Sequence, residues 1–172
     1  MTSSHFVLKM ERGSCNNTTA VVDVLSDQNI VEGGNRTMNS DVITKEQAQQ
    51  MWKGFEGSFN EAAIDKIIAG FADDAVVRFA DLPEMRGIEE VGKFLRARFA
   101  RLKGYRIKKT FKSVADNIIG GMWDAEWVDA KTGKKMQGRG AEFVKFVRGK
   151  IIEWDCAFNI WEKGVPHQLE II

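Results

Sequence analysis

The chain has 172 residues, 44% of them hydrophobic, and its 25 basic and 24 acidic residues leave a net charge of +1. This length suits one domain, and the near-zero charge provides no net field to attract a polyanion, so no nucleic-acid partner is expected. No apolar stretch approaches the roughly 18 residues of a membrane-spanning helix and no signal peptide is visible, so we expect a cytoplasmic protein without a membrane partner.

Cysteine and histidine usage argues against metal sites and histidine-assisted nucleophiles. Cys15 and Cys156 are too few for a disulfide framework or a zinc site. His5 and His167 lie outside the expected core, so a Ser-His-Asp or Cys-His arrangement has no histidine on the scaffold. We expect no metal and no cofactor. Any acid or base must be a carboxyl, a lysine or Tyr105, the single tyrosine.

The chain divides into an arm, a domain and a short tail. Residues 1–41 are rich in Ser, Thr, Asn and Gly without a sustained hydrophobic period, which predicts a flexible N-terminal arm. Met38 is a candidate natural start. The expected domain spans residues 42–163, and residues 164–172 form the tail.

Three helices are predicted in the domain. Thr44 followed by Gln47 resembles a capping box, and residues 45–59 carry one apolar stripe: Ala48, Met51, Trp52, Phe55 and Phe59. A second short helix, capped by Asn60, buries Ile64, Ile67, Ile68 and Phe71. After a strand over residues 74–80 and a Pro/Gly connector, residues 88–103 form an amphipathic helix whose apolar row is interrupted by Arg98.

Four long strands complete the domain. They are expected over residues 105–116, 117–129, 134–147 and 151–161, with hairpin loops at residues 130–133 and 148–149. These loops set a register that places one group of pairs on one face: Glu142 opposite Asp155, Gly138 opposite Asn159, Met136 opposite Trp161 and Trp127 opposite Met136. A three-residue loop with a bulge at Arg148-Gly149 would slip this register by one and turn one carboxyl outward.

Helices first and an antiparallel meander last predict an α+β fold. Strand glycines at Gly120, Gly121, Gly138 and Gly140 permit the sheet to curl into a cone.

The element order over residues 44–161 resembles the nuclear transport factor 2-like superfamily, in particular its SnoaL-like, polyketide cyclase-like branch. Segments that carry the resemblance are Phe94-Leu95-Arg96-Ala97-Arg98, Tyr105-Arg106-Ile107-Lys108-Lys109, Trp123-Asp124-Ala125-Glu126-Trp127 and Gly138-Arg139-Gly140-Ala141-Glu142. The resemblance implies a helix-covered cone with a deep hydrophobic pocket and a homodimer that packs sheet to sheet. It does not imply one reaction, because members include isomerases, dehydratases, hydrolases and proteins without known catalysis.

The paired carboxyls suggest acid–base chemistry. Glu142 and Asp155 would supply one ionised and one protonated carboxyl, and either Arg98 or Lys109 would hold the ionised one. Asn159 would orient a water or a carbonyl, while Phe79, Trp123, Trp127 and Trp161 would provide flat walls for a ring. The structural alternative is a network in which the cation satisfies both acids.

The opposite sheet face is expected to carry Trp154, Cys156 and Phe158 and to form the dimer interface. Asp124 opposite Arg139 is predicted as an ion pair on that face.

Two functions stay open. One is a cofactor-independent isomerase, cyclase, dehydratase or hydrolase acting on a small apolar or aromatic carbonyl compound. The other is a non-catalytic ligand-binding or dimerising module.

Overall fold

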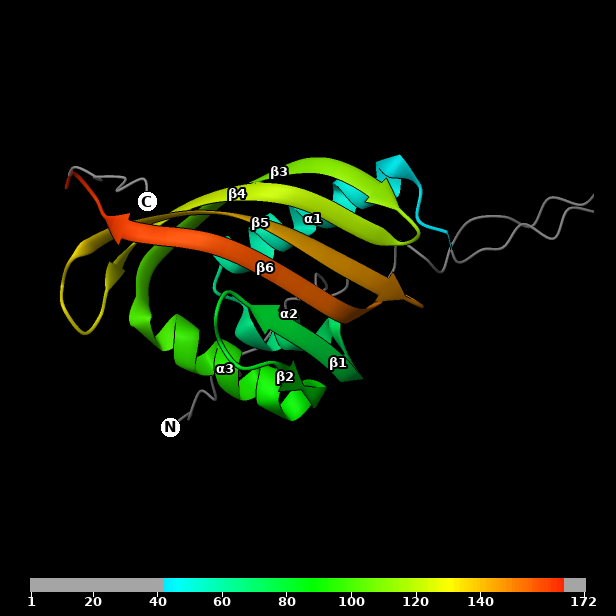
Figure 1. Cartoon of the computed structure of the whole chain (residues 1–172), viewed down its shortest axis with the longest axis horizontal. Coiled ribbons are helices and arrows are strands. Elements are labelled where there is room, and N and C mark those ends of the chain that lie inside the picture. The colour runs from blue at the N-terminus through cyan, green and yellow to red at the C-terminus, as the bar shows by residue number, and fades with distance from the viewer. Residues whose placement is uncertain (1–41, 166–172) are drawn as a thin grey trace, which may run out of the picture. The chain divides into compact units, whose positions relative to one another are not determined.

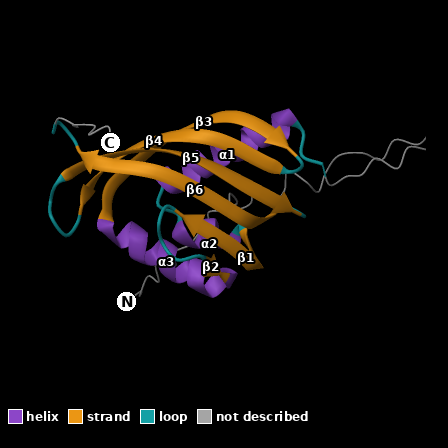
Figure 2. Cartoon of the chain, viewed as in Figure 1, coloured by secondary structure: helices purple, strands orange, loops and turns teal. Residues whose placement is uncertain are grey.

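The computed structural model describes residues 42–165, so the predictions for the arm, including Met38, lie outside the described residues. Three helices and six strands make up the domain (Figures 1 and 2). In chain order they are α1 (Lys45–Asn60), α2 (Ile64–Ala69), β1 (Phe71–Phe79), β2 (Met85–Arg86), α3 (Gly87–Arg101), β3 (Leu102–Ala115), β4 (Ile118–Asp129), β5 (Lys135–Val147) and β6 (Lys150–Glu162).

One mixed sheet carries the domain, with the strand order β2-β1-β6-β5-β4-β3. The antiparallel meander β3–β6 is confirmed. Beyond the prediction, β1 pairs with β6 in parallel and β2 adds a short antiparallel edge. The sheet bends over the helices, which lie on its concave side (Figure 1). This α+β arrangement confirms the predicted fold class.

The first helix begins where the sequence predicts. The Thr44 side chain accepts a hydrogen bond from the Gln47 N–H (3.2 Å), and the Gln47 side chain accepts one from the Thr44 N–H (2.8 Å), which completes the capping box. Asn60 does not cap α2, whose N-cap is Ala63. Instead its side chain bonds both the N–H (2.8 Å) and the carbonyl (3.0 Å) of Ile107. Asn60 therefore fastens α1 to the edge strand β3.

The register between β5 and β6 differs from the prediction by one residue. The two-residue turn is present, since Arg148 and Gly149 have φ of 49° and 74° and Val147 faces Lys150. The ladder then shifts between Phe146 and Lys145, so that β6 holds one extra residue, Ile152, as a bulge.

That bulge inverts the predicted faces of β6, because a one-residue slip moves every side chain to the other side. Glu142 faces Cys156, whereas Asp155 faces Phe143. The predicted pairs Glu142–Asp155, Gly138–Asn159 and Met136–Trp161 are therefore wrong, while Trp127 opposite Met136 is confirmed. The placement of Trp154, Cys156 and Phe158 on the outer face is wrong for the same reason.

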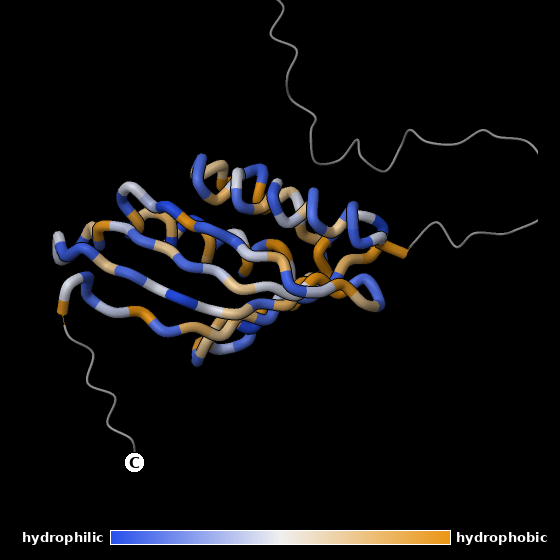
Figure 3. Tube along the Cα trace, turned by 90° about the horizontal axis from the view of Figure 1, so that it is seen from above, coloured by the Kyte–Doolittle hydropathy of each residue, from blue (hydrophilic) through white to orange (hydrophobic). Residues whose placement is uncertain are grey.

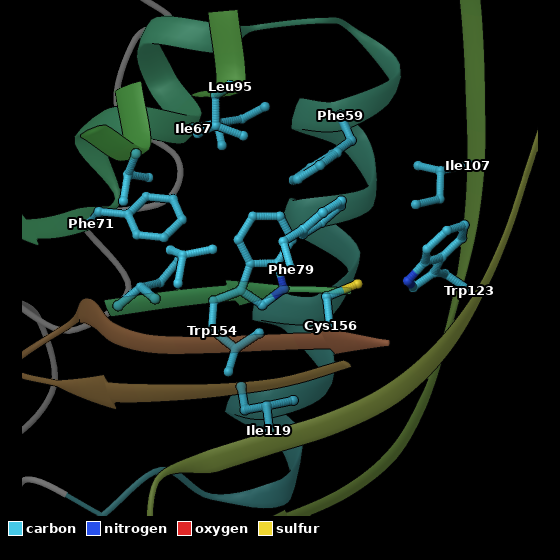
Figure 4. Close-up of a cluster of buried hydrophobic side chains, with 14 of the residues drawn as sticks. Phe59, Ile67, Phe71, Phe79, Leu95, Ile107, Ile119, Trp123, Trp154 and Cys156 are labelled. Atoms are coloured by element: carbon cyan, nitrogen blue, oxygen red, sulfur yellow. The ribbon is translucent and has the colours of Figure 1, made fainter. Parts of the chain in front are cut away.

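The concave face of the sheet and the helices enclose the core. Hydrophilic and hydrophobic residues alternate along the long strands (Figure 3), which is the pattern of a sheet with one buried face. Trp154 lies among the rings of Phe59, Phe71 and Phe79, with ring centroids 5.3–6.2 Å apart. Figure 4 shows this cluster with Cys156 and Trp123 beside it. Aromatic packing thus fills the hollow of the cone.

Two glycines test how closely this core is packed. A Cβ on Gly121 would lie 2.3 Å from the Trp52 ring, whereas a Cβ on Gly92 in α3 would meet Ile68 at an ordinary 3.6 Å. We expect Gly121→Ala to lower the free energy of unfolding by about 1–3 kcal/mol through overpacking. Gly92→Ala should raise it by up to about 1 kcal/mol, because alanine is the better helix former. Denaturant unfolding measures both, and equal midpoints for the two variants would contradict the described packing.

Candidate functional site

A buried ion pair between Lys109 and Glu142 lies at the centre of the concave face. The two side chains are only 3% and 2% exposed. Lys109 donates to one carboxylate oxygen of Glu142, and the Trp154 indole N–H donates to the other at 3.0 Å. Both carboxylate oxygens therefore have a partner, as a buried charge requires.

The strand geometry explains how the two charges meet. Lys109 projects inward from β3 and Glu142 from β5, with β4 between them. The β4 residue opposite Glu142 is Gly121, which has no side chain to stand in the way. Glu56 of α1 accepts the Lys109 backbone N–H at 2.5 Å and so fixes this position of β3. Strands β3 and β5, helix α1 and the missing side chain of Gly121 together position this ion pair.

Aromatic rings surround the ammonium group. The Lys109 Nζ lies 5.0 Å from the Trp52 ring centroid and 4.9 Å from that of Phe59. Their π faces attract the cation and replace part of its lost hydration. The indole N–H of Trp52 is itself buried without a hydrogen-bond partner.

A second polar group, made by Arg98, Tyr105 and Cys156, faces the same interior. Burial raises the pKa of Tyr105 to about 12, although the neighbouring Arg98 acts to lower it. Burial also raises the pKa of the Cys156 thiol to about 12, against the smaller effect of its hydrogen bond with Trp123. At neutral pH the phenol is a hydrogen-bond donor and the thiol is not a nucleophile.

Arg98 occupies the outer end of this group. It is half-buried, and its guanidinium lies 4.7 Å from the ring centroid of Phe79 and 5.7 Å from that of Phe158. The space among Arg98, Tyr105, Trp123 and Glu142 available to the centre of a water-sized sphere is about 10 Å³. That volume suits about one water molecule, whereas pockets for drug-sized ligands measure roughly 300–1,000 Å³. A ring-bearing ligand can be accommodated here only if half-buried side chains move.

The structure thus brings together five of the predicted site residues and separates four. Glu142, Lys109, Arg98, Trp123 and Phe79 surround the interior space. Trp127 lies on the same face but nearer the sheet end, with its ring 6.0 Å from that of Tyr105.

Asp155, Asn159 and Trp161 lie on the outer side of β6, opposite Phe143, Arg139 and Gln137. The Asp155 carboxylate binds Arg78 at 3.2 Å, and its side chain is 45% exposed. The hypothesis of a Glu142–Asp155 carboxyl pair is therefore wrong. Of the two cations predicted to hold a carboxylate, Lys109 binds Glu142.

Three residues that line the interior space, Tyr105, Trp154 and Cys156, were not among the predicted site residues. A usable signal was present, because Trp154, Cys156 and Phe158 alternate with Glu153, Asp155 and Asn159, which is the pattern of one buried face. The alternation along β6 therefore predicts the buried face correctly, whereas the number of loop residues does not.

One sequence prediction for the outer face is confirmed. Asp124 and Arg139 form an exposed ion pair at 2.8 Å, as predicted. No group of three His, Cys, Asp or Glu that could hold a metal ion occurs within residues 42–165. In that same part of the chain, no helix is long and apolar enough to cross a membrane.

Comparison with known families assigns the scaffold. The family described as SnoaL-like domain matches residues 52–154, more than half of the 172 residues. The chain belongs to the SnoaL-like domain family. This confirms the expected placement in the SnoaL-like branch of the nuclear transport factor 2-like superfamily.

Two solved structures share the fold of this SnoaL-like domain. A putative polyketide cyclase from Xanthomonas campestris pv. campestris has a TM-score of 0.60 and 17% identity, covering 67% of this chain and 92% of its own. An LEH-like epoxide hydrolase from M. tuberculosis has a TM-score of 0.53 and 17% identity, covering 62% of this chain and 78% of its own. A search among curated proteins gave no match. At these identities the likeness shows the fold alone.

The raised pKa of Tyr105 can be measured directly, because it is the single tyrosine. Absorbance at the tyrosinate band should show the phenol ionising with a pKa of about 12 in the folded protein, against 10.0 for the free side chain. The folded state favours the neutral phenol. The contribution of Tyr105 to the free energy of unfolding is therefore complete below pH 10, and up to about 2–3 kcal/mol of it is lost as the pH rises toward 12. Tyr105→Phe should remove this part of the alkaline loss of stability. Ionisation near pH 10 in the folded protein would contradict the buried placement.

Proposed function

We propose that this SnoaL-like domain is a small-molecule pocket protein that transfers protons on a ring-bearing carbonyl compound without a cofactor. The observation that carries the proposal is the Lys109–Glu142 ion pair, buried in an apolar interior and facing the same small space as Tyr105 and Arg98. A buried ion pair is often no more stabilising than apolar residues of the same size, so stability alone gives little reason for it. Buried charges that face an interior space are candidates for functional groups.

The residues suit proton abstraction beside a carbonyl group. Glu142, held by Lys109 and Trp154, would take a proton from the carbon next to the carbonyl and return it to another carbon. The electron pair released by the broken C–H bond would move onto the carbonyl oxygen. Tyr105, a neutral phenol, would donate a hydrogen bond to that oxygen as its negative charge develops.

The same steps serve isomerisation, and with a second carbonyl group in the substrate they serve ring closure. The structural neighbours, a putative polyketide cyclase and an LEH-like epoxide hydrolase, support small-molecule chemistry on this fold. Trp123 and Phe158, whose ring centroids lie 5.6 Å apart, would give the ring its flat walls. Phe158 is only half-buried, so its displacement by a ligand would disturb the core less than that of Trp123.

The experiment compares an apolar replacement of the ion pair with a surface control. Steroid-like, terpenoid and aromatic polyketide carbonyl compounds are screened by thermal shift, and hits are followed for turnover by NMR. The double variant Lys109→Met/Glu142→Leu should keep the fold, because apolar side chains of similar size replace both charges together. It should lower turnover by about 10²- to 10⁴-fold. Asp155→Asn, on the outer face, should leave turnover unchanged.

Two outcomes would contradict the catalytic proposal. One is a set of bound ligands that the wild-type protein never converts, which would favour a non-catalytic binding module. The other is full turnover in the double variant, which would make the ion pair merely structural.

A second candidate role, homodimerisation, rests on the outer face of the sheet. Met122, Ala141 and Ala157 lie side by side across β4, β5 and β6, and the Phe143 side chain nearby is 54% exposed. Exposed apolar residues gathered on one face mark interaction sites. We propose a second copy of this chain as the partner, because adjacent Asp124 and Arg139 give the face charges of both signs, which a two-fold axis can pair.

Sedimentation equilibrium tests the dimer. Wild-type protein is expected to sediment as a dimer at micromolar concentrations, and Phe143→Glu as a monomer, because the charge would be buried without a partner. Leu82→Glu is the control, since Leu82 is also exposed (48%) but lies in the β1–β2 connector. A monomeric wild type, or a dimer that survives Phe143→Glu, would rule this interface out.

A further inference from the structure

Arg98 differs from the other arginines of its helix. Arg96 and Arg101 each bind a carboxylate at 2.7 Å, that of Asp65 and that of Asp129 respectively. Arg98 instead points between α3 and the sheet, where its guanidinium contacts the rings of Phe79 and Phe158. Within residues 42–165 no acidic side chain forms an ion pair with Arg98.

The rings satisfy this guanidinium only in part. Aromatic faces attract the cation, yet they offer no lone pairs to the several N–H donors of its planar fork. The fork has the geometry that binds a carboxylate through two parallel hydrogen bonds. A half-buried guanidinium without a counter-charge is therefore suited to receive an anion.

The neighbouring groups supply no free charged acceptor, since the hydroxyl oxygen of Tyr105, which hydrogen-bonds with Arg98, is neutral. Tyr105 is buried beside Arg98 and keeps its phenolic proton. The nearest acid of the interior, Glu142, already accepts hydrogen bonds from Lys109 and Trp154. Arg98, Tyr105 and Glu142 nevertheless line one space, so a ligand held by Arg98 would reach the other two.

We infer that the ligand is an organic acid: its carboxylate binds the guanidinium of Arg98, and its ring lies against Trp123 and Phe158. This assignment rests on the proposed function, since it concerns the same interior site, and it narrows the ligand from carbonyl compounds in general to anionic ones. Arg98 is then a specificity-determining residue. It selects the ligand by charge and does not take part in the proton transfer.

Matched probes that differ only in charge test this inference. Titration calorimetry compares 2-naphthoate with 2-naphthamide, and cinnamate with cinnamide, because each amide keeps the shape of its acid. We expect the acids to bind at least tenfold more tightly. Arg98→Gln should remove that preference by weakening acid binding about tenfold or more while leaving amide binding unchanged. Arg98→Lys should restore only part of it, because lysine keeps the charge but loses the fork.

Arg96→Gln is the control, since Arg96 lies on the exposed side of the same helix. Far-ultraviolet circular dichroism and thermal unfolding confirm that each variant is folded. Equal binding of acid and amide, an unchanged acid affinity in Arg98→Gln, or failure of both acids to bind at millimolar concentration would overturn the inference.

The outcome separates this inference from the catalytic proposal. Charge-selective binding that depends on Arg98, without Glu142-dependent turnover of any ligand, supports the acid site and contradicts the proton-transfer function. Turnover of a neutral carbonyl compound that depends on Glu142 but not on Arg98 supports the proton-transfer function and contradicts the acid site.

Discussion

The ion pair between Lys109 and Glu142 constrains the rest of the domain, because a charge withdrawn from water must be matched where it lies. Four separate features meet at this pair. β3 supplies the cation and β5 the anion, Gly121 on β4 leaves the path between them open, and Trp154 on β6 satisfies the second carboxylate oxygen. Removing either charge alone would strand the other in an aromatic interior. The packing around the site and its electrostatics therefore cannot be changed independently.

The bulge at Ile152 belongs to the same constraint. Without it, the turn at Arg148-Gly149 would place Asp155 inside the sheet and Trp154 outside. The interior would then hold two carboxylates and one ammonium group, with no indole N–H for Glu142. With it, one anion meets one cation, and Asp155 reaches solvent beside Arg78. One extra residue in β6 balances the interior charges.

Most of the local structure could be predicted from the sequence, because local signals determine it. The capping box at Thr44, the alternation along the strands and the two hairpin turns each depend on neighbours in the chain. The register of β6 could not be predicted from turn counting, since a bulge conserves the turn and shifts everything beyond it. The bulge residue, Ile152, faces the part of β1 where the parallel ladder is also irregular, between Phe71 and Val76. That pairing is a tertiary feature, which spacing along the chain does not report.

The role of the strand glycines shows a second limit of sequence reasoning. Glycines on the inner face predict open space, yet at Gly140 a Cβ would lie 2.7 Å from the Trp123 ring. The space is present, but a side chain of the protein occupies it. Composition reveals that large and small residues share a face, and only their arrangement in space shows which fills which.

The filled interior makes ligand binding depend on a few side chains at its edge. Trp123 and Trp154 are almost fully buried and held by aromatic neighbours, whereas Arg98 and Phe158 are half-buried. Moving the inner rings would disrupt the packing of the core. Separating Arg98 from the ring of Phe158 needs less free energy, so a ligand would enter there. A neutral ligand would have to break that contact without replacing it, while an anion would give the guanidinium a better partner as it moves. The cost of opening this interior therefore favours a charged ligand over a neutral one of the same shape.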